Sequence, residues 1–123
     1  MKMQEMVHLI DGEVLYGNAE MMETDVTVAY SADLLSDVLA LTEGDTLLIT
    51  GTTSLQVIRV AEILGITGIV FVRGKRPADD VISVAQKRLN IPIITTNKTM
   101  FEASGLLFTH GVRPCKNRLS TEV

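Results

Sequence analysis

The sequence lacks several features that mark special classes of protein. It has a single cysteine, Cys115, no tryptophan, and only 4% aromatic residues among 123. One cysteine cannot form an internal disulfide, which fits a reducing cytoplasm. So few aromatic rings offer no platform on which nucleic-acid bases would stack. No apolar run reaches the ~18 residues of a membrane helix, and the N-terminus has no signal-peptide core. We therefore expect a cytoplasmic protein with neither membrane nor nucleic-acid partners.

Sequence motifs of common enzymes and metal sites are also missing. Neither GxxxxGK[ST] nor GxGxxG, the glycine-rich phosphate-binding patterns, occurs in the chain. His8 and His110 lie far apart and lack metal-ligand spacing, and Cys115 has no activating partner nearby in the sequence. The net charge of −4 disfavours general binding to nucleic acid. These observations predict no catalytic residue, no metal and no cofactor.

The composition is that of an ordinary globular domain, with 46% hydrophobic and 21% charged residues. Short apolar runs at 47–49 and 69–72 are typical of strands buried on both faces of a parallel sheet. An apolar stripe at helical spacing lies between them. We expect a capping box of Thr53 and Gln56 to open this helix, and Gly65 to end it. Strand, helix and strand at this spacing form a βαβ unit.

Strand–loop–helix units recur along the rest of the chain. A helix is expected at 78–89, with acidic residues in its first turn and basic residues in its last, which complements the helix dipole. A third strand is expected at 92–95, and a second capping box, Thr99 with Glu102, opens the helix that follows it. Near the N-terminus, Met3, Met6, Val7 and Ile10 form a helical stripe that fits a core or a subunit contact.

These elements predict a single α/β domain over residues 1–112 and a C-terminal tail over 113–123. The sheet is expected to be mainly parallel, with about five strands and flanking helices. Two further strands, at 13–16 and 25–30, are expected to pair antiparallel to the others or to lie at an edge. A short helix is expected at 34–41. The pattern leaves the strand order open.

Three polar loops follow the strands of the predicted parallel sheet. Because the carboxyl ends of parallel strands gather on one side, these loops are expected to converge. Hydroxyls and a flexible glycine before a helix suit an anion, and three cations surround one glycine in the second loop. The candidate ligand-binding residues are Thr50, Gly51, Thr52, Thr53, Ser54, Arg73, Gly74, Lys75, Arg76, Thr95, Thr96, Asn97 and Lys98. The alternative is that the hydroxyls only cap helices and the cations only form a solvated loop or salt bridges.

Four segments together resemble the DRTGG domain family. They are EVLYGN, DVTVAYSADLLSDVLA, GDTLLITGTTSLQVIRVAEILGITGIVFVRGKRP and IPIITTNKTMFEA, and they span most of residues 1–112. The resemblance implies a fold similar to the N-terminal domain of HPr kinase/phosphorylase. It also implies an accessory role, because similar domains lie inside phosphate acetyltransferases and between the CBS domains of regulated pyrophosphatases. There the domain is associated with dimer contacts and regulation, and the P-loop of the kinase lies in a different domain.

Three functions remain open at this point. The first is a non-catalytic regulatory or assembly module that forms a homodimer, with a possible protein partner in a regulatory or redox complex. The second is a sensor that binds an anionic small molecule such as an adenine nucleotide through the three loops. The third is an enzyme that uses Lys75 or Asp33 as acid or base, which would require burial to shift the pKa of the lysine.

Overall fold

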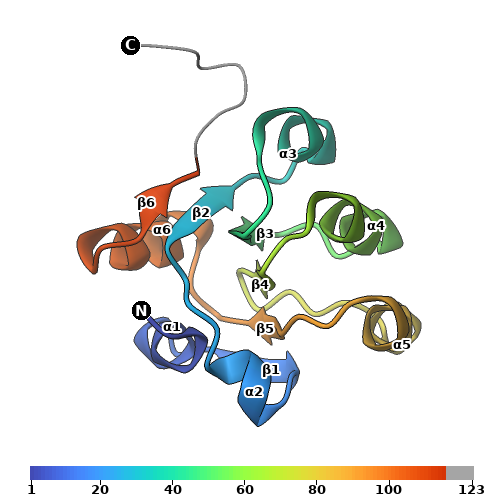
Figure 1. Ribbon diagram of the computed structural model, residues 1–123, viewed down its shortest axis with the longest axis horizontal. Helices are drawn as coiled ribbons and strands as arrows, with labels where there is room; N and C mark the ends of the chain where they lie inside the picture. The colour runs from blue at the N-terminus through green and yellow to red at the C-terminus, as the bar shows by residue number, and fades with distance from the viewer. Residues whose placement is uncertain (116–123) are drawn as a thin grey trace.

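A computed structural model describes residues 1–115 of the chain. Six strands form one sheet in the order β1-β5-β4-β3-β2-β6. Helices cover both faces of this sheet, so the domain has three layers (Figure 1). In chain order the elements are α1 (Met3–Leu9), β1 (Glu13–Tyr16), α2 (Ala19–Met22), β2 (Val28–Ser31), α3 (Leu35–Leu41), β3 (Thr46–Thr50), α4 (Leu55–Leu64), β4 (Gly68–Phe71), α5 (Asp79–Arg88), β5 (Ile93–Thr95), α6 (Met100–Thr109) and β6 (Arg113–Pro114).

The connections between strands explain which helices share a face. β2, β3, β4 and β5 are neighbours in chain order and run parallel, and α3, α4 and α5 connect them on one side of the sheet. After β5 the chain crosses the opposite face as α6 and returns to the far edge, where β6 pairs with β2. The chain therefore leaves β4 and β5 toward opposite faces. A crevice at the carboxyl ends of strands is expected at such a switch point.

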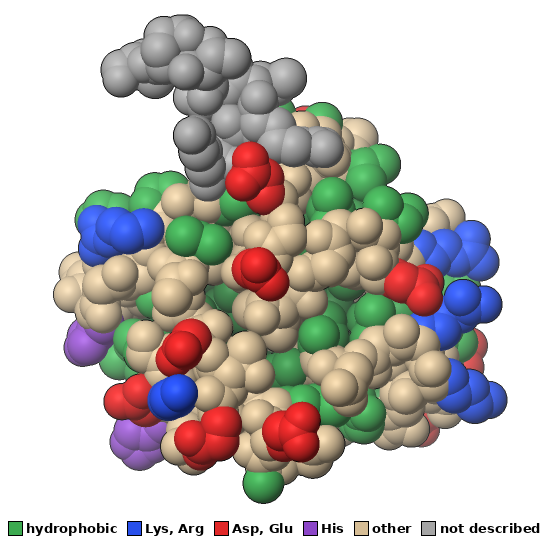
Figure 2. Space-filling model, viewed as in Figure 1, with side chains coloured by type: hydrophobic (Ala, Val, Ile, Leu, Met, Phe, Trp, Pro, Cys, Tyr) green, Lys and Arg blue, Asp and Glu red, His purple; other side chains and the backbone are tan. Residues whose placement is uncertain are grey.

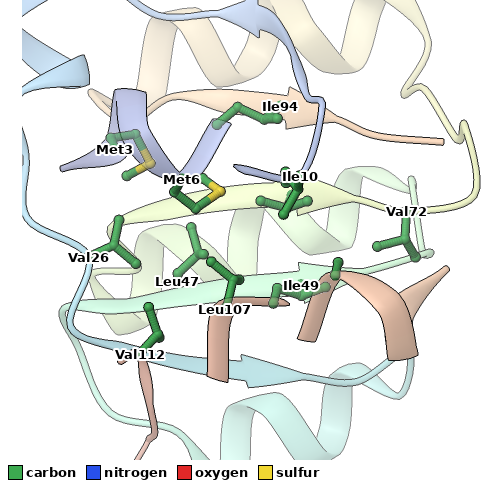
Figure 3. Packing of buried hydrophobic residues seen from close by; sticks show 12 residues of the cluster. Met3, Met6, Ile10, Val26, Leu47, Ile49, Val72, Ile94, Leu107 and Val112 are labelled. Carbon is green, nitrogen blue, oxygen red and sulfur yellow. The ribbon is translucent and has the colours of Figure 1, made fainter. Parts of the chain in front are cut away.

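Two hydrophobic clusters, one on each face, hold the layers together. Phe71 and residues of α3, α4 and α5 form one cluster. The other lies between the sheet, α1 and α6. In it Met3 and Met6 of α1, and Ile10 directly after α1, pack toward strand residues such as Leu47 (Figure 3). The N-terminal methionine stripe is thus core rather than a subunit contact, because Met3 and Met6 have no exposed surface in the single chain.

The sequence predicted three features at helix ends, and the structure confirms two of them. Gly65 ends α4 in the left-handed conformation, and Thr99 and Glu102 form the expected capping box of α6. The capping box of Thr53 and Gln56 was a wrong prediction, because Ser54 is the N-cap of α4 and makes no side-chain capping bond. The preceding loop is instead bonded to the end of β2, as described below, and the helix begins one residue later than expected.

The charges of α5 follow the expected arrangement. Asp79 and Asp80 lie in its first turn and Lys87 and Arg88 in its last. Arg88 also reaches α4, where its guanidinium lies 3.7 Å from the carboxylate of Glu62. Figure 2 shows Lys and Arg side chains gathered at the edge of the molecule where α4 and α5 lie, while acidic side chains are spread over the face in view.

The prediction of a mainly parallel α/β sheet is confirmed, with three differences in detail. The strand expected at 25–30 is observed at 28–31 and is parallel to β3 rather than antiparallel, whereas β1 is the antiparallel edge strand. The sheet has six strands instead of about five, because residues 113–114, expected in the tail, form β6. Cys115 is also buried, so the tail cannot begin at 113. Its remaining residues, 116–123, lie outside the described part of the chain.

Residues 1–115 contain neither a membrane-spanning helix nor a cluster of metal ligands. None of the helices within 1–115 is both long and apolar enough to cross a bilayer. In that range no three His, Cys, Asp or Glu side chains come together in a way that would hold a metal ion.

Candidate functional site

The carboxyl ends of β3, β4 and β5 lie side by side at one end of the sheet. Thr50, Phe71 and Thr95 are register partners across these three parallel strands. This confirms that the three polar loops converge. We call the residues 50–54, 73–76 and 95–98 the rim.

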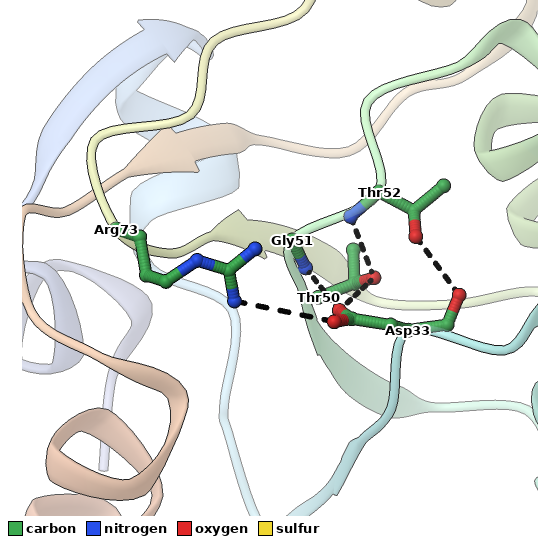
Figure 4. Close-up of polar contacts among 5 residues, drawn as sticks. All are labelled: Asp33, Thr50, Gly51, Thr52 and Arg73. Carbon is green, nitrogen blue, oxygen red and sulfur yellow. Dashed lines mark hydrogen bonds and ion pairs between the residues drawn. The ribbon is translucent and has the colours of Figure 1, made fainter.

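Asp33, just beyond the end of β2, organises the β3 part of the rim. Its carboxylate oxygen Oδ1 accepts hydrogen bonds from the Gly51 amide at 2.7 Å and from the Thr50 hydroxyl at 3.4 Å. Its backbone carbonyl accepts from the Thr52 hydroxyl at 2.8 Å. Arg73 lies across the cluster, with Nη1 4.0 Å from Asp33 Oδ2 (Figure 4). One carboxylate therefore joins the loops that follow β2, β3 and β4.

The guanidinium of Arg73 lies close to Gly51, which precedes Thr52. A Cβ atom on Gly51 would lie 2.6 Å from Nη2 of Arg73, so any side chain there would displace the guanidinium. Arg73 itself has a positive φ of 58°, a conformation that is uncommon for a residue with a side chain. Its amide bonds to the carbonyl of Lys98 at 2.8 Å, and the Gly74 amide bonds to the carbonyl of Thr96 at the same distance. These bonds fix the turn after β4 against the loop after β5.

The crevice expected between β4 and β5 is present. A hollow of about 300 Å³ lies there, with Gly74 and Asn97 on its walls. Gly74 also has a positive φ, and a Cβ at this position would lie 2.9 Å from the side-chain oxygen of Asn97. The other residues lining the hollow are Asp11, Glu13, Arg76, Thr95 and Thr96. The crevice is therefore polar and carries both signs of charge.

Ion pairs hold two of the three remaining cations of the rim. Arg76 makes a bidentate bond to Glu13 of β1, with distances of 2.9 and 3.1 Å. Hydrogen bonding to Arg76 and its positive charge lower the pKa of Glu13 below its usual range. Lys98 lies 3.6 Å from the carboxylate of Asp11. The fourth rim cation, Lys75, is exposed and forms no ion pair with any residue in 1–115.

The N-terminus of α6 already has an acceptor from its own chain. The Glu102 carboxylate accepts from the Thr99 amide at 2.9 Å, and the Thr99 hydroxyl accepts from the Glu102 amide at 3.1 Å. The hydrogen bond that the carboxylate accepts from the Thr99 amide is the main cause that lowers the pKa of Glu102. An external anion at this helix start would have to displace a carboxylate, so the start of α4, where Ser54 makes no side-chain cap, is the more accessible of the two.

Several predicted site hydroxyls serve the protein's own backbone. The Thr95 hydroxyl donates to the carbonyl of Lys75 and the Thr96 hydroxyl to that of Ile10, each at 2.7 Å. Both threonines are buried, as is Thr50. Thr52 and Thr53 are half-buried, whereas Ser54 and Asn97 are exposed. A ligand-binding role for the thirteen residues stays a prediction.

Three acidic residues at this end of the molecule were not among the predicted ligand-binding residues. Asp33, Asp11 and Glu13 supply the carboxylates that pair with the rim cations. Asp33 follows the strand predicted at 25–30. If that strand runs parallel to the others, Asp33 lies with the three loops at the carboxyl ends of the strands. Its place could not be assigned because the direction of that strand was left open. Asp11 and Glu13 come from the N-terminal part of the chain, and no local pattern linked them to loops more than sixty residues away.

The fold is similar to a solved regulatory region. The match is to the crystal structure of the CBS and DRTGG domains of the regulatory region of Clostridium perfringens pyrophosphatase, which was determined in complex with its activator, diadenosine tetraphosphate. The TM-score is 0.69 at 19% sequence identity, over 86% of this chain and 45% of the other. This chain thus corresponds to less than half of that structure. No curated protein gave a match in sequence.

The family comparison agrees with the resemblance of the four sequence segments. The DRTGG domain matches residues 5–114, which extends from α1 through β6. The match therefore includes every strand of the sheet and all three loops of the rim. The chain belongs to the DRTGG domain family.

Proposed function

We propose that the chain is a non-catalytic regulatory or assembly module that works as a homodimer. The observation that carries the proposal is the similarity of nearly the whole domain to a DRTGG domain that belongs to a regulatory region. The paired charges of the rim are consistent with it. Asp33 with Arg73 and Glu13 with Arg76 join neighbouring loops, which is a structural role that needs no substrate.

The mass of the protein in solution tests the homodimer. Sedimentation velocity over a concentration series should give twice the chain mass of 13.4 kDa. A strict monomer at the highest concentration would exclude the homodimer. The non-catalytic part is tested separately by incubating the protein with pyrophosphate and adenine nucleotides. Turnover that disappears in an Asp33→Asn variant would argue for an enzyme instead.

A second candidate function is the sensing of an adenine nucleotide at the rim. Two observations support an anion site at the rim. Lys75 is exposed beside the turn of Arg73 and Gly74, so its charge is available to phosphate groups. The crevice at the switch point between β4 and β5 lies next to this turn, at the position where open α/β sheets bind ligands. Five of the thirteen predicted residues line this crevice, namely Gly74, Arg76, Thr95, Thr96 and Asn97.

Thermal unfolding with a ligand panel tests the sensor. ATP, ADP, AMP, diadenosine tetraphosphate and inorganic phosphate are added separately to the full chain. A ligand at 100 times its dissociation constant stabilises the folded state by about 2.7 kcal/mol, which raises the melting temperature measurably. We expect the shift to shrink at least threefold in Arg73→Ala and in Lys75→Ala.

The matched control is Lys87→Ala, which removes an exposed cation from the last turn of α5 instead of from the rim. It should leave the ligand-induced shift unchanged. No shift with any ligand, or an equal shift in the Arg73, Lys75 and Lys87 variants, would contradict nucleotide binding at the rim. Neither result would affect the proposed homodimer.

A further inference from the structure

The outward surface of α6 exposes large aromatic side chains. Phe101 is 87% exposed and Phe108 is 52% exposed. Gly105 lies between them in the helix, and a Cβ at this position would have no atom within 4 Å. Exposed aromatic residues that gather on one surface usually mark a contact site. We call Phe101, Glu102, Gly105, Phe108 and Thr109 the α6 face.

Helical geometry places these residues in two rows. At 3.6 residues per turn, Phe101 and Phe108 lie on the same side of Gly105, and Glu102 and Thr109 lie on the other side. Phe101 is four residues before Gly105, or about 6 Å along the axis, and Phe108 is three residues after it, or about 4.5 Å. The two phenylalanines are therefore nearly equidistant from the glycine.

This spacing makes the α6 face complementary to itself. A two-fold axis that passes across the helix at Gly105 sets a second α6 antiparallel to the first, and each residue before Gly105 then meets one after it. Phe101 meets Phe108 of the partner subunit, and the same contact forms twice. Gly105 lets the two backbones approach closely, since it adds no side chain at the crossing point. Aromatic side chains in contact also pack favourably edge-to-face or offset.

The charges at the two ends of α6 favour the same antiparallel arrangement. Glu102 lies in the first turn. Arg113 lies at the other end, where Nη2 donates to the carbonyl of Phe108 at 2.7 Å and the guanidinium stands 4.2 Å from the centre of the Phe108 ring. Lys98 also lies near the first turn, but its positive charge is offset by its ion pair with Asp11. An antiparallel pair brings each acidic start toward a basic end, whereas a parallel pair brings like charges together.

We propose that a second copy of this chain occupies the α6 face, with the two α6 helices antiparallel and crossing at Gly105. The proposal rests on the homodimer proposed above and assigns its interface. Phe101 and Phe108 form one row of this interface and Glu102 and Thr109 form the other, on either side of Gly105, and Arg113 lies toward the end of the pair.

Sedimentation velocity of two matched variants tests the assignment. Phe101→Asp places a charge within the proposed interface, and we expect it to raise the dimer dissociation constant at least tenfold. Ile63→Asp places the same charge on α4, where Ile63 is 70% exposed, and should leave the dissociation constant unchanged. Circular dichroism and the melting temperature at low concentration verify that both variants fold. Folding should be retained because both side chains are largely solvated in the single chain.

Disulfide cross-linking tests the antiparallel pairing directly. A tagged Phe101→Cys variant is mixed with an untagged Phe108→Cys variant under mild oxidation. The mixture should give more cross-linked dimer than either variant alone, because residues 101 and 108 meet only across the two-fold axis. The unsubstituted chain, which keeps the buried Cys115, measures the background.

The outcomes separate this inference from the proposal on which it rests. If the unsubstituted chain is a dimer, but Phe101→Asp leaves it intact and the mixed cysteine variants do not cross-link, then the homodimer stands and the α6 interface is wrong. If the unsubstituted chain stays monomeric at every concentration, both fail.

Discussion

Replacing Phe71 by alanine should lower the free energy of unfolding by about 3–5 kcal/mol, the usual cost of removing a buried phenylalanine ring. Phe71 is fully buried and is the largest side chain with this degree of burial in the described chain. It ends β4, between β3 and β5, and packs in the cluster under α3, α4 and α5. Its removal leaves a cavity that neighbouring strands cannot close without shifting. Urea unfolding at one fixed low concentration measures the change and limits any effect of dimer formation.

The chain offers a matched control for this substitution. Phe101→Ala removes the same side chain from a position that is almost fully exposed, and it should change the free energy of unfolding by no more than about 0.5 kcal/mol. A similar effect of the two substitutions would contradict the burial assigned to Phe71. Since domains of this kind are usually stable by about 5–15 kcal/mol, Phe71→Ala removes a large share of the total.

The central strands were predictable because a strand that is buried on both faces has an uninterrupted run of apolar residues. The runs at 47–49 and 69–72 contain no alternating polar residues, and the strands observed there are fully buried. Gly65 was equally informative, since a glycine directly after a helical stripe commonly provides the left-handed residue that ends the helix. In each case a local sequence pattern reflects a local physical requirement.

The edges of the sheet were harder to predict because they depend on long-range pairing. β6 has two residues, one of which is Pro114, and neither has a strand pattern. It exists because α6 carries the chain back to β2, where the amides of Arg113 and Cys115 bond to the carbonyls of Thr27 and Ala29. Nothing within residues 113–115 indicates this partner. The order of β1 and β5 was undetermined for the same reason.

The candidate site shows the same division between local and long-range information. The three loops could be placed together because one rule covers all parallel strands. Their ion pairs could not be foreseen, because the partner of Arg73 is forty residues earlier in the chain and the partner of Arg76 is on β1. The capping box at Thr53 was wrongly predicted for a related reason. Its loop is bonded to Asp33, and a helix-start pattern takes no account of such a contact.

Replacing Met6 by alanine should lower the free energy of unfolding by about 2–5 kcal/mol, from lost burial and from the cavity that remains. Met6 is fully buried in the cluster between α1, α6 and the sheet. α1 has only seven residues, too few to be stable without packing, so its attachment depends on side chains such as Met3 and Met6. Met6→Leu keeps the apolar volume and should cost less than about 1.5 kcal/mol.

The concentration dependence of the Met6→Ala effect shows whether the methionine stripe packs in the core of one chain or in a contact between two chains. If Met6 stabilised only a contact between chains, the loss in Met6→Ala would vanish at protein concentrations low enough to dissociate the dimer. Since Met6 is covered within one chain, we expect the same loss in urea unfolding at every concentration. A loss that depends on concentration would place the methionine stripe at an interface and would contradict the packing of α1 against the sheet.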